Sequence, residues 1–421
     1  MPYVLGVDLG HTRTTAAVCR RIDGFWRDPE VVPLEGDARW MESTLQVSLD
    51  GSVLVGQAAA YGSPASSRTV RGLLRRVGDP VPLVVGEHAY PAEVLAAAMV
   101  GWVADVVTSA HGGQPEQIVL NHPPCWGQHR KRALYEALEA AGLPGVLLLP
   151  TPVAAAENHL VAEPVEAGAV LAVCRLGGEH VESAILRRVA AGFELMDSAT
   201  SAEPQAGALI DDLLVDHVQA KINGELPDPN GLAALRLGCA WAKEQLSVES
   251  AVRLAVPHAG EVHLSRREFE HLARGVLEAA TAQLRRIASR VPEDQLTAAL
   301  LVGGSARIPL LAVLAEAALH RHGSGCRVLV DPDPGSALCR GAALVARRRI
   351  APDQEPGYTT VLPQTAQPMD AIENQPNEVA EQEIGPPPPR PPVEITPLEP
   401  PRRFASLRRG SRGDDGDEDS R

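Results

Sequence analysis

The sequence predicts an α/β protein in which two similar lobes face each other across a cleft. Strand and helix signals alternate along residues 1–350, which is typical of this fold class. A unit of strand, tight turn and strand occurs near the start and again at residues 169–186, and further α/β segments follow each unit. This weak internal duplication indicates two lobes, and ligands usually bind in the cleft between lobes.

The composition of the chain changes near residue 350. Beyond it come proline-rich and charged segments such as GPPPPRPP and GDDGDEDSR, with few apolar residues. Such a segment cannot bury enough surface to offset its chain entropy. We therefore predict a folded domain over 1–350, with lobe I at about 1–165 and lobe II at about 166–350. Residues 351–421 are predicted to form a disordered tail with polyproline character around Pro386–Pro392.

Bulk properties exclude several classes of protein. The net charge of −14 argues against nucleic acid or an anionic membrane surface as the main partner. Six scattered cysteines without a C-x-x-C pair predict buried, reduced thiols in a cytoplasmic setting. The N-terminus lacks the basic region of a signal peptide, and no apolar stretch is expected to reach the ~20 residues of a membrane span.

In the first half of the chain, a hairpin around residues 11–13 precedes alternating helices and strands. Apolar spacing predicts helices at 93–110, 127–143 and 151–161, and strands at 117–124 and 145–150. In the second half, the hairpin at 169–186 precedes helices at 237–247 and 268–291. A strand, glycine turn and helix follow at 298–319, and a last helix at 334–349.

The turn of the second hairpin raises the question of its role. Gly177 and Gly178 sit between two apolar runs, and backbone N–H groups in such a turn can bind a phosphate. Arg175, Glu179, His180 and Glu182 crowd the same turn, and two of these are carboxylates. From the residues alone, the turn is a phosphate loop, the remnant of one, or a plain hairpin.

Five segments that follow one another along the chain resemble a known family, and this resemblance indicates the role of the second turn. Three of them are glycine turns. In chain order the five are GVDLGHTRTTAAV, the second hairpin with LPTPVAAAENHL before it, CAWAKEQLS, LVGGSARIPLL and VDPDPGSALCRGAALVA. In this order, they resemble the nucleotide-binding domain of DnaK-type (heat-shock protein 70 family) chaperones, in the actin-like ATPase superfamily with its ribonuclease H-like fold. The resemblance covers about residues 3–347.

The resemblance implies that ATP or ADP lies between the lobes, with its phosphates in the two hairpin turns. In that family two aspartates hold Mg²⁺ through water, and a lysine and a glutamate position the attacking water. Asp8 would hold Mg²⁺, Thr12 would assist hydrolysis, Arg13 would pair with phosphate, and Arg307 would stack on the base. The implied nucleotide-binding residues are Asp8, Gly10, Thr12, Arg13, Gly177, Gly178, Lys243, Ser247, Gly303, Gly304, Ser305, Arg307 and Asp333.

The catalytic positions depart from the family pattern. Arg175 stands at the second magnesium aspartate, and Thr151 stands at the water-positioning glutamate. Leu74, or Arg75 with a one-residue shift, stands at the lysine. Glu179 adds a negative charge beside the phosphates. Because phosphoryl transfer depends on positioned water and neutralised charge, we expect a phosphate loop by descent and weak or absent hydrolysis.

Three functional hypotheses follow from these features. The first is a nucleotide-dependent switch that signals to an unidentified protein partner through its proline-rich tail. The second is a non-enzymatic scaffold in which an Arg175–Asp8 pair closes an empty cleft. The third is an active ATPase with compensating residues. The chain runs from this domain directly into the tail, so client-peptide capture by the family's peptide-binding domain is not expected.

Overall fold

The computed structural model describes residues 1–62, 67–203, 205–222, 229–256, 259–292, 294–320 and 326–352. Every element below belongs to one compact unit, Met1–Glu355. From residue 353 onward, the predicted tail and its polyproline stretch lie outside the described residues.

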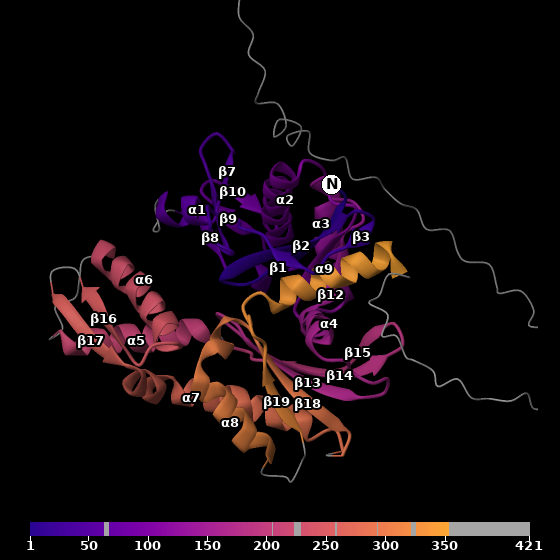
Figure 1. The fold of residues 1–421 in the computed structure, drawn as a ribbon. Helices are drawn as coiled ribbons and strands as arrows, with labels where there is room; N and C mark the ends of the chain where they lie inside the picture. Colours follow the sequence, from indigo (N-terminus) through magenta and orange to yellow (C-terminus); the bar gives the residue numbers. More distant parts are fainter. Residues whose placement is uncertain are drawn as a thin grey trace, which may run out of the picture. The chain divides into compact units, whose positions relative to one another are not determined.

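A seven-stranded sheet carries the first hairpin (Figure 1). β1 (Tyr3–Leu9) runs antiparallel to β2 (Arg13–Ile22) and parallel to β11 (Ile118–His122). It is buried along its whole length, as expected for a central strand of apolar residues. The strand order is β12 (Leu147–Pro150), β11 (Ile118–His122), β1 (Tyr3–Leu9), β2 (Arg13–Ile22) and β3 (Phe25–Trp26), with β4 (Glu30–Val31) and β5 (Met41–Glu42) also paired to β2.

A five-stranded sheet carries the second hairpin and repeats the topology of the first. β13 runs antiparallel to β14 and parallel to β18, which is parallel to β19. The order is β15 (Gly192–Thr200), β14 (Val181–Val189), β13 (Val170–Leu176), β18 (Leu296–Val302) and β19 (Arg327–Val330). In both sheets the second strand of the hairpin lies on one side of the first, and the parallel strands lie on the other. The predicted duplication is therefore present in the strand order.

The two hairpins also match residue by residue. Asp8 of β1 lies opposite Thr15 of β2, and Arg175 of β13 lies opposite Glu182 of β14. Asp8 and Arg175 are each followed by the leucine that ends the strand, Leu9 in β1 and Leu176 in β13. One structural position is therefore acidic in the first sheet and basic in the second.

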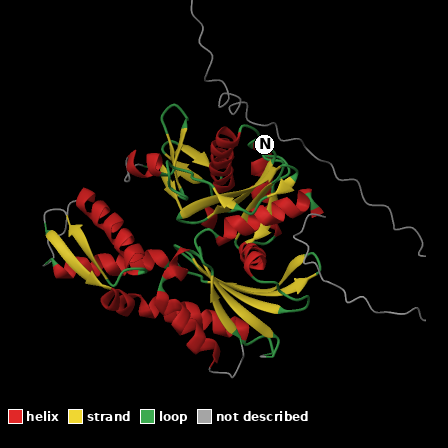
Figure 2. Ribbon diagram, in the orientation of Figure 1, coloured by secondary structure: helices red, strands yellow, loops and turns green. Residues whose placement is uncertain are grey.

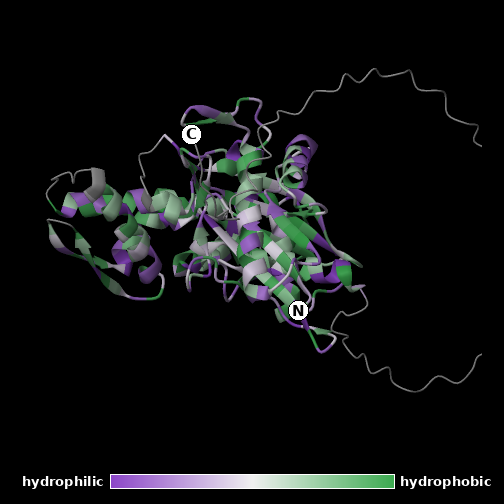
Figure 3. Ribbon diagram, turned by 90° about the horizontal axis from the view of Figure 1, so that it is seen from above, coloured by the Kyte–Doolittle hydropathy of each residue, from purple (hydrophilic) through white to green (hydrophobic). Residues whose placement is uncertain are grey.

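Helices cover both sheets (Figure 2). Apolar residues of α2 (Ala92–His111) and α3 (Gln128–Ala140) share a core with β1 and β11. Apolar residues of α7 (Arg266–Ala288) and α8 (Pro309–His320) share another core with β13 and β18. Figure 3 shows hydrophobic residues, in green, along the helices and strands of the fold. α7 begins in a capping box, in which Ser265 accepts from the Glu268 backbone N–H and Glu268 accepts from the Ser265 backbone N–H.

The helices α4 (Thr151–Ala162) and α9 (Ala337–Ile350) connect the two sheets. α4 packs on β13 and β15, whereas α9 packs on β1 and β2 and against α4. Glycines permit the close approach of these backbones. A Cβ added at Gly341 would lie 1.8 Å from the carbonyl oxygen of Ala154, and one added at Gly6 would lie 2.2 Å from the backbone N of Ala343.

Several elements were not predicted from the sequence, although most of the longer ones were. The predicted helix at 237–247 extends backward as α6 (Pro229–Leu246), and α5 (Gly207–Lys221) precedes it. β16 (Ala251–Val256) and β17 (Gly260–Ser265) form a separate hairpin. The first half of the chain adds β6 (Thr44–Val47), β7 (Val53–Val55), α1 (Gln57–Gly62), β8 (Thr69–Arg71), the 3₁₀ turn η1 (Leu73–Arg75), β9 (Leu83–Val85) and β10 (His88–Tyr90).

α2 corrects the expectation that no apolar stretch reaches the length of a membrane span. Its 20 residues are long and apolar enough by length and composition. The same helix buries Leu95, Met99 and Val103 in the core shared with β1. Core helices of soluble proteins pass the same test, so α2 is weak evidence for a span.

Candidate functional site

The loops at the ends of both sheets line one cleft of about 750 Å³. This volume lies in the range of small-molecule sites. Of the residues singled out at the catalytic positions, Thr12 and Arg175 line it, whereas Leu74 and Thr151 are not among its lining residues. All the residues implied for nucleotide binding line it: Asp8, Gly10, Thr12, Arg13, Gly177, Gly178, Lys243, Ser247, Gly303, Gly304, Ser305, Arg307 and Asp333.

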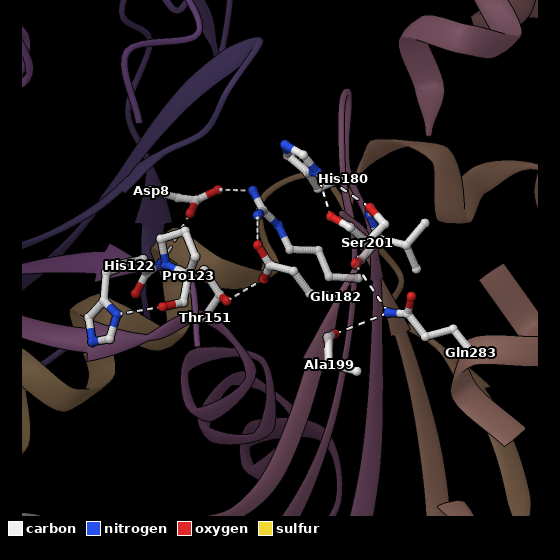
Figure 4. A network of polar contacts seen from close by, with 12 residues as sticks. Asp8, His122, Pro123, Thr151, His180, Glu182, Ala199, Ser201 and Gln283 are labelled. Carbon is white, nitrogen blue, oxygen red and sulfur yellow. Dashed lines mark hydrogen bonds and ion pairs between the residues drawn. The ribbon is translucent and has the colours of Figure 1, made fainter. Parts of the chain in front are cut away.

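A buried ion-paired centre lies where the two hairpins meet. The guanidinium of Arg175 donates through Nη1 to Glu182 Oε1 at 2.9 Å, and its Nη2 lies 3.6 Å from Asp8 Oδ2. The hydroxyl of Thr151 donates to the other Glu182 oxygen at 2.5 Å. Asn121 Nδ2 lies 3.5 Å from Asp8 Oδ1. Figure 4 shows Asp8, Glu182 and Thr151 around this centre.

The environment of this centre sets its charge states. Burial raises the pKa of Asp8, with the nearby Glu182 charge acting in the same direction and Arg175 opposing both. Desolvation acts to lower the pKa of Arg175, but the charges of Glu182 and Asp8 outweigh it and raise that pKa. Arg175 therefore stays protonated between two carboxyl groups.

Magnesium does not fit this centre. Mg²⁺ requires oxygen ligands in near-octahedral geometry, but a guanidinium stands between the two carboxylates and lies 3.6 Å from Asp8. Arg175 supplies the positive charge there and offers no oxygen. The magnesium role implied for Asp8 is thus replaced by an ion pair with a residue of the other sheet.

Leu74 and Arg75, the two residues that the sequence allowed at the family's lysine position, have different surroundings. Leu74 is buried in the core beside α2, so it cannot reach the cleft. Arg75 donates through Nη2 to Glu179 Oε1 at 3.0 Å. We expected Glu179 to add a negative charge beside the phosphates, but it has a cationic partner in Arg75. The sequence placed Arg75 only at the position of the family's lysine and did not pair it with Glu179.

The two hairpin turns lie in contact. A Cβ added at Gly178 would lie 2.1 Å from Thr12 Oγ1, so only glycine fits opposite Thr12. The backbone N–H groups of Gly207 and Ala208 donate to the carbonyls of Gly177 and Gly178, at 3.1 and 2.6 Å. The start of α5 therefore fixes the second turn, which the sequence did not indicate.

Arg13 also has protein partners. It forms an ion pair with Glu244 of α6, and its guanidinium lies 3.8 Å from the ring centroid of Trp40. Neither partner was singled out from the sequence as an ion-pair or stacking partner. The pair joins the first hairpin to α6 across the cleft, but it is partly exposed, so its net contribution to stability is small.

The nucleoside side of the cleft is built on β18 and α6. Gly303 has φ +91, and a Cβ there would lie 2.5 Å from the Leu176 carbonyl oxygen, so this turn requires glycine. The next residue differs, because a Cβ at Gly304 meets nothing within 4 Å. The Ser305 hydroxyl lies 3.4 Å from the Gly177 carbonyl oxygen. The third turn thus contacts the second turn and leaves open space at Gly304.

The basic side chains on this side are already paired. Lys243 donates to Asp211 Oδ2 at 2.7 Å and to the Gly207 carbonyl at 3.1 Å. Burial raises the pKa of Asp211, and Lys243 opposes that shift. Arg307 donates to Asp333 Oδ1 at 2.6 Å. Ser247 donates back to the Lys243 carbonyl at 3.0 Å. Asp211 was missed because its partner lies 32 positions away.

An adenine nucleotide fits the space and donor set on this side. Glycine backbone at the second and third turns, an open position at Gly304 and a planar guanidinium at Arg307 suit a ribose and a base. Arg307, Lys243 and Ser247 would hold the nucleoside. A bound nucleotide would bring its phosphates to the turns at Gly10 and Gly177.

Comparisons with known proteins agree with this geometry. Residues 76–351, more than half of the chain, match the family model described as Hsp70 protein. The chain is 26% identical over 383 residues to a "Chaperone protein HscA homolog" of Acidithiobacillus ferrooxidans, covering 83% of this chain and 59% of that protein. It is 25% identical over 382 residues to a "Chaperone protein DnaK" of Thermosipho melanesiensis, covering 86% and 61%.

The chain thus spans about three fifths of the length of these relatives. The matched region holds the second sheet, the third glycine turn, and Arg175, Glu182 and Thr151 of the buried centre. With the duplicated sheets and the shared cleft, the chain belongs to the Hsp70 family and carries its nucleotide-binding domain of the actin-like ATPase fold.

Proposed function

We propose that this chain is a chaperone-related protein that binds ATP or ADP in the cleft and hydrolyses ATP weakly or not at all. The observation that carries the proposal is the Arg175 guanidinium between Asp8 and Glu182. It occupies the space between the two acids, and it removes the metal centre on which the family's hydrolysis depends. Nucleotide binding would then act as a switch of the cleft rather than as a step of turnover.

Two further positions support weak hydrolysis. The Thr151 hydroxyl donates its proton to Glu182, and an uncharged hydroxyl lacks the carboxylate with which a glutamate would orient an attacking water. Leu74 is apolar and buried, and Arg75 is engaged by Glu179. Phosphoryl transfer depends on positioned groups and charge neutralisation. Arg175, Thr151 and Leu74 stand at three of the family's catalytic positions, and together they remove most of the groups that position water and neutralise charge.

A scaffold function is the second candidate, and a specific observation favours it. Three ion pairs join the first hairpin or its neighbours to the second half of the chain: Asp8–Arg175, Arg75–Glu179 and Arg13–Glu244. Under this alternative the pairs close the cleft, and no nucleotide is needed.

Gly304→Val tests nucleotide binding by filling the open position. We expect ADP affinity to fall by at least about tenfold, or about 1.4 kcal/mol, with the free energy of unfolding unchanged. Stability is preserved because a Cβ at Gly304 meets no atom within 4 Å and its φ is not positive. Calorimetric titration with ADP measures the affinity, and urea unfolding measures the stability.

Gly127→Val is the matched control. Gly127 also has nothing within 4 Å of an added Cβ, its backbone is extended, and it does not line the cleft. It should leave ADP affinity unchanged. Unaltered ADP binding by Gly304→Val would contradict the proposed pocket, and no ADP binding by the unmodified chain would favour the scaffold.

The remaining parts of the proposal concern regions and properties beyond the cleft. We propose lobes at about 1–165 and 166–350, a protein partner for the proline-rich tail, and a cytoplasmic location. A pull-down with the full chain and with a chain ending at residue 352 tests the tail. A partner bound equally by both would contradict that part.

A further inference from the structure

The two hairpin turns bring two histidines and a glutamate together at the cleft. His11 lies between β1 and β2, and Glu179 and His180 lie between β13 and β14. One potential ligand atom from each lies within 4.8 Å of the others. The rings of His11 and His180 are 4.8 Å apart between centroids and meet edge to face. These residues stand beside the Arg175 centre but are not part of its ion pairs.

The surroundings leave a lone pair available on each of these side chains. His180 Nδ1 lies 3.1 Å from the Ser201 carbonyl oxygen. Because a carbonyl only accepts, this contact requires the proton on Nδ1, which leaves Nε2 as a free acceptor. The same arrangement orients histidines that bind metals. A neutral imidazole keeps one unprotonated ring nitrogen, so His11 can offer a lone pair in the same way.

Glu179 contributes an oxygen that lacks a protein partner. Oε1 accepts from Arg75, whereas Oε2 is buried and has no hydrogen-bond partner among the described residues. A buried carboxylate oxygen without a partner is costly. A metal ion would satisfy it.

We propose that His11, Glu179 and His180 form a binding site for a divalent transition metal of the zinc type. Two imidazoles and one carboxylate are the donor set that zinc favours, with a fourth position open to water. Magnesium and calcium prefer oxygen ligands alone. Donors bonded to one zinc ion lie roughly 3.4 Å apart, so small side-chain rotations close the present spacing.

Metal binding at this site would link the two halves of the fold, because His11 belongs to the first hairpin and the other two ligands to the second. Arg75 neutralises part of the Glu179 charge, and the part of the chain that the structure describes supplies three protein ligands. We therefore expect weaker binding than at four-ligand structural zinc sites. The inference does not depend on nucleotide binding, since the ligands need no nucleotide atom.

The test uses the full chain without nucleotide, in a Cys125→Ser background. Cys125 is exposed and free, and its thiol would bind zinc by itself. The parent is titrated with ZnCl₂ by calorimetry and with CoCl₂ by visible absorption. The variants are His11→Ala, His180→Ala and Glu179→Gln, with His88→Ala as an exposed histidine control.

We expect one saturable site in the parent, a loss of at least about tenfold in zinc affinity in each ligand variant, and no change in His88→Ala. Zinc should also raise the Tm of the parent by mass action but not that of His11→Ala. Glu179→Gln preserves side-chain size, so it remains informative should an alanine variant unfold. Absence of saturable zinc binding in the parent, or equal affinity in the parent and the two histidine variants, would overturn the proposal.

Discussion

Replacing Arg175 with methionine should lower the free energy of unfolding by about 3–5 kcal/mol at pH 7. The change leaves Asp8 and Glu182 buried without the cation that lies between them. Breaking a buried pair costs more than the pair contributes, because the remaining charge is uncompensated. Urea unfolding measures the loss, and an unchanged m-value would show that the loss is one of stability.

The stability loss of Arg175→Met should depend on pH, and the burial of Asp8 determines the direction of that dependence. Burial already raises the pKa of Asp8 while Arg175 is present, and removing Arg175 raises it further. A carboxyl group whose pKa is raised in the folded state stabilises the fold below its unfolded pKa of about 3.9, and that stability is lost as the pH rises. The deficit of Arg175→Met should therefore be smaller at pH 5 than at pH 7.

Arg290→Met is the control for Arg175→Met. Arg290 also pairs with an acid, Asp197, but its side chain is 59% exposed. Surface pairs contribute about 0–1 kcal/mol, so this variant should lose less than about 1 kcal/mol. Equal stability of Arg175→Met and the unmodified chain at pH 7 would show that the buried centre does not hold the fold.

Gly341→Val should destabilise the chain by about 3 kcal/mol or more, at the upper end for overpacked cores. Its first added carbon would lie 1.8 Å from the Ala154 carbonyl oxygen, a backbone atom that no side-chain rotation can move. The two helices would have to separate, although α9 also packs on β1 through Gly6. Thermal and urea unfolding measure the effect.

Gly101→Ala supplies the comparison for this second variant. Gly101 lies inside α2, and an added Cβ there meets nothing within 4 Å. Alanine is favoured over glycine inside a helix by about 1 kcal/mol, so this variant should be neutral or slightly stabilising. If Gly341→Val were as stable as Gly101→Ala, the close crossing of α4 and α9 would be wrong.

The two hairpins and the parallel strands β11, β12 and β18 could be predicted from the sequence because they are apolar runs next to glycine or proline, whereas β15 and β19 were not predicted. β1, β13 and β18 are buried along nearly their whole lengths, and such runs carry a strong local signal. The strands of two to four residues between β3 and β10 carry no such period. α5 and the hairpin of β16 and β17 do carry helical and alternating patterns, but no motif drew attention to them.

The candidate site was predicted as a set of positions rather than as a set of contacts. The Arg175–Asp8 pair was predicted only as part of the scaffold hypothesis. The third member of the centre, Glu182, was noted only as one of the carboxylates near the second turn, and Thr151 only as the residue at the position of the family's glutamate. Side-chain reach across the cleft decides these contacts, as it does for Arg75 and Glu179, and sequence spacing does not encode reach.

The most direct test of the account is the magnesium dependence of nucleotide binding. The full chain is titrated calorimetrically with ADP and ATP, once in EDTA and once in excess Mg²⁺, with phosphate release followed in parallel. Because Arg175 stands in the metal's position, we expect the Kd values in the two buffers to agree within about threefold, below about 1 kcal/mol, with no sustained phosphate release. Binding at least about tenfold tighter with Mg²⁺, accompanied by turnover, would contradict the account.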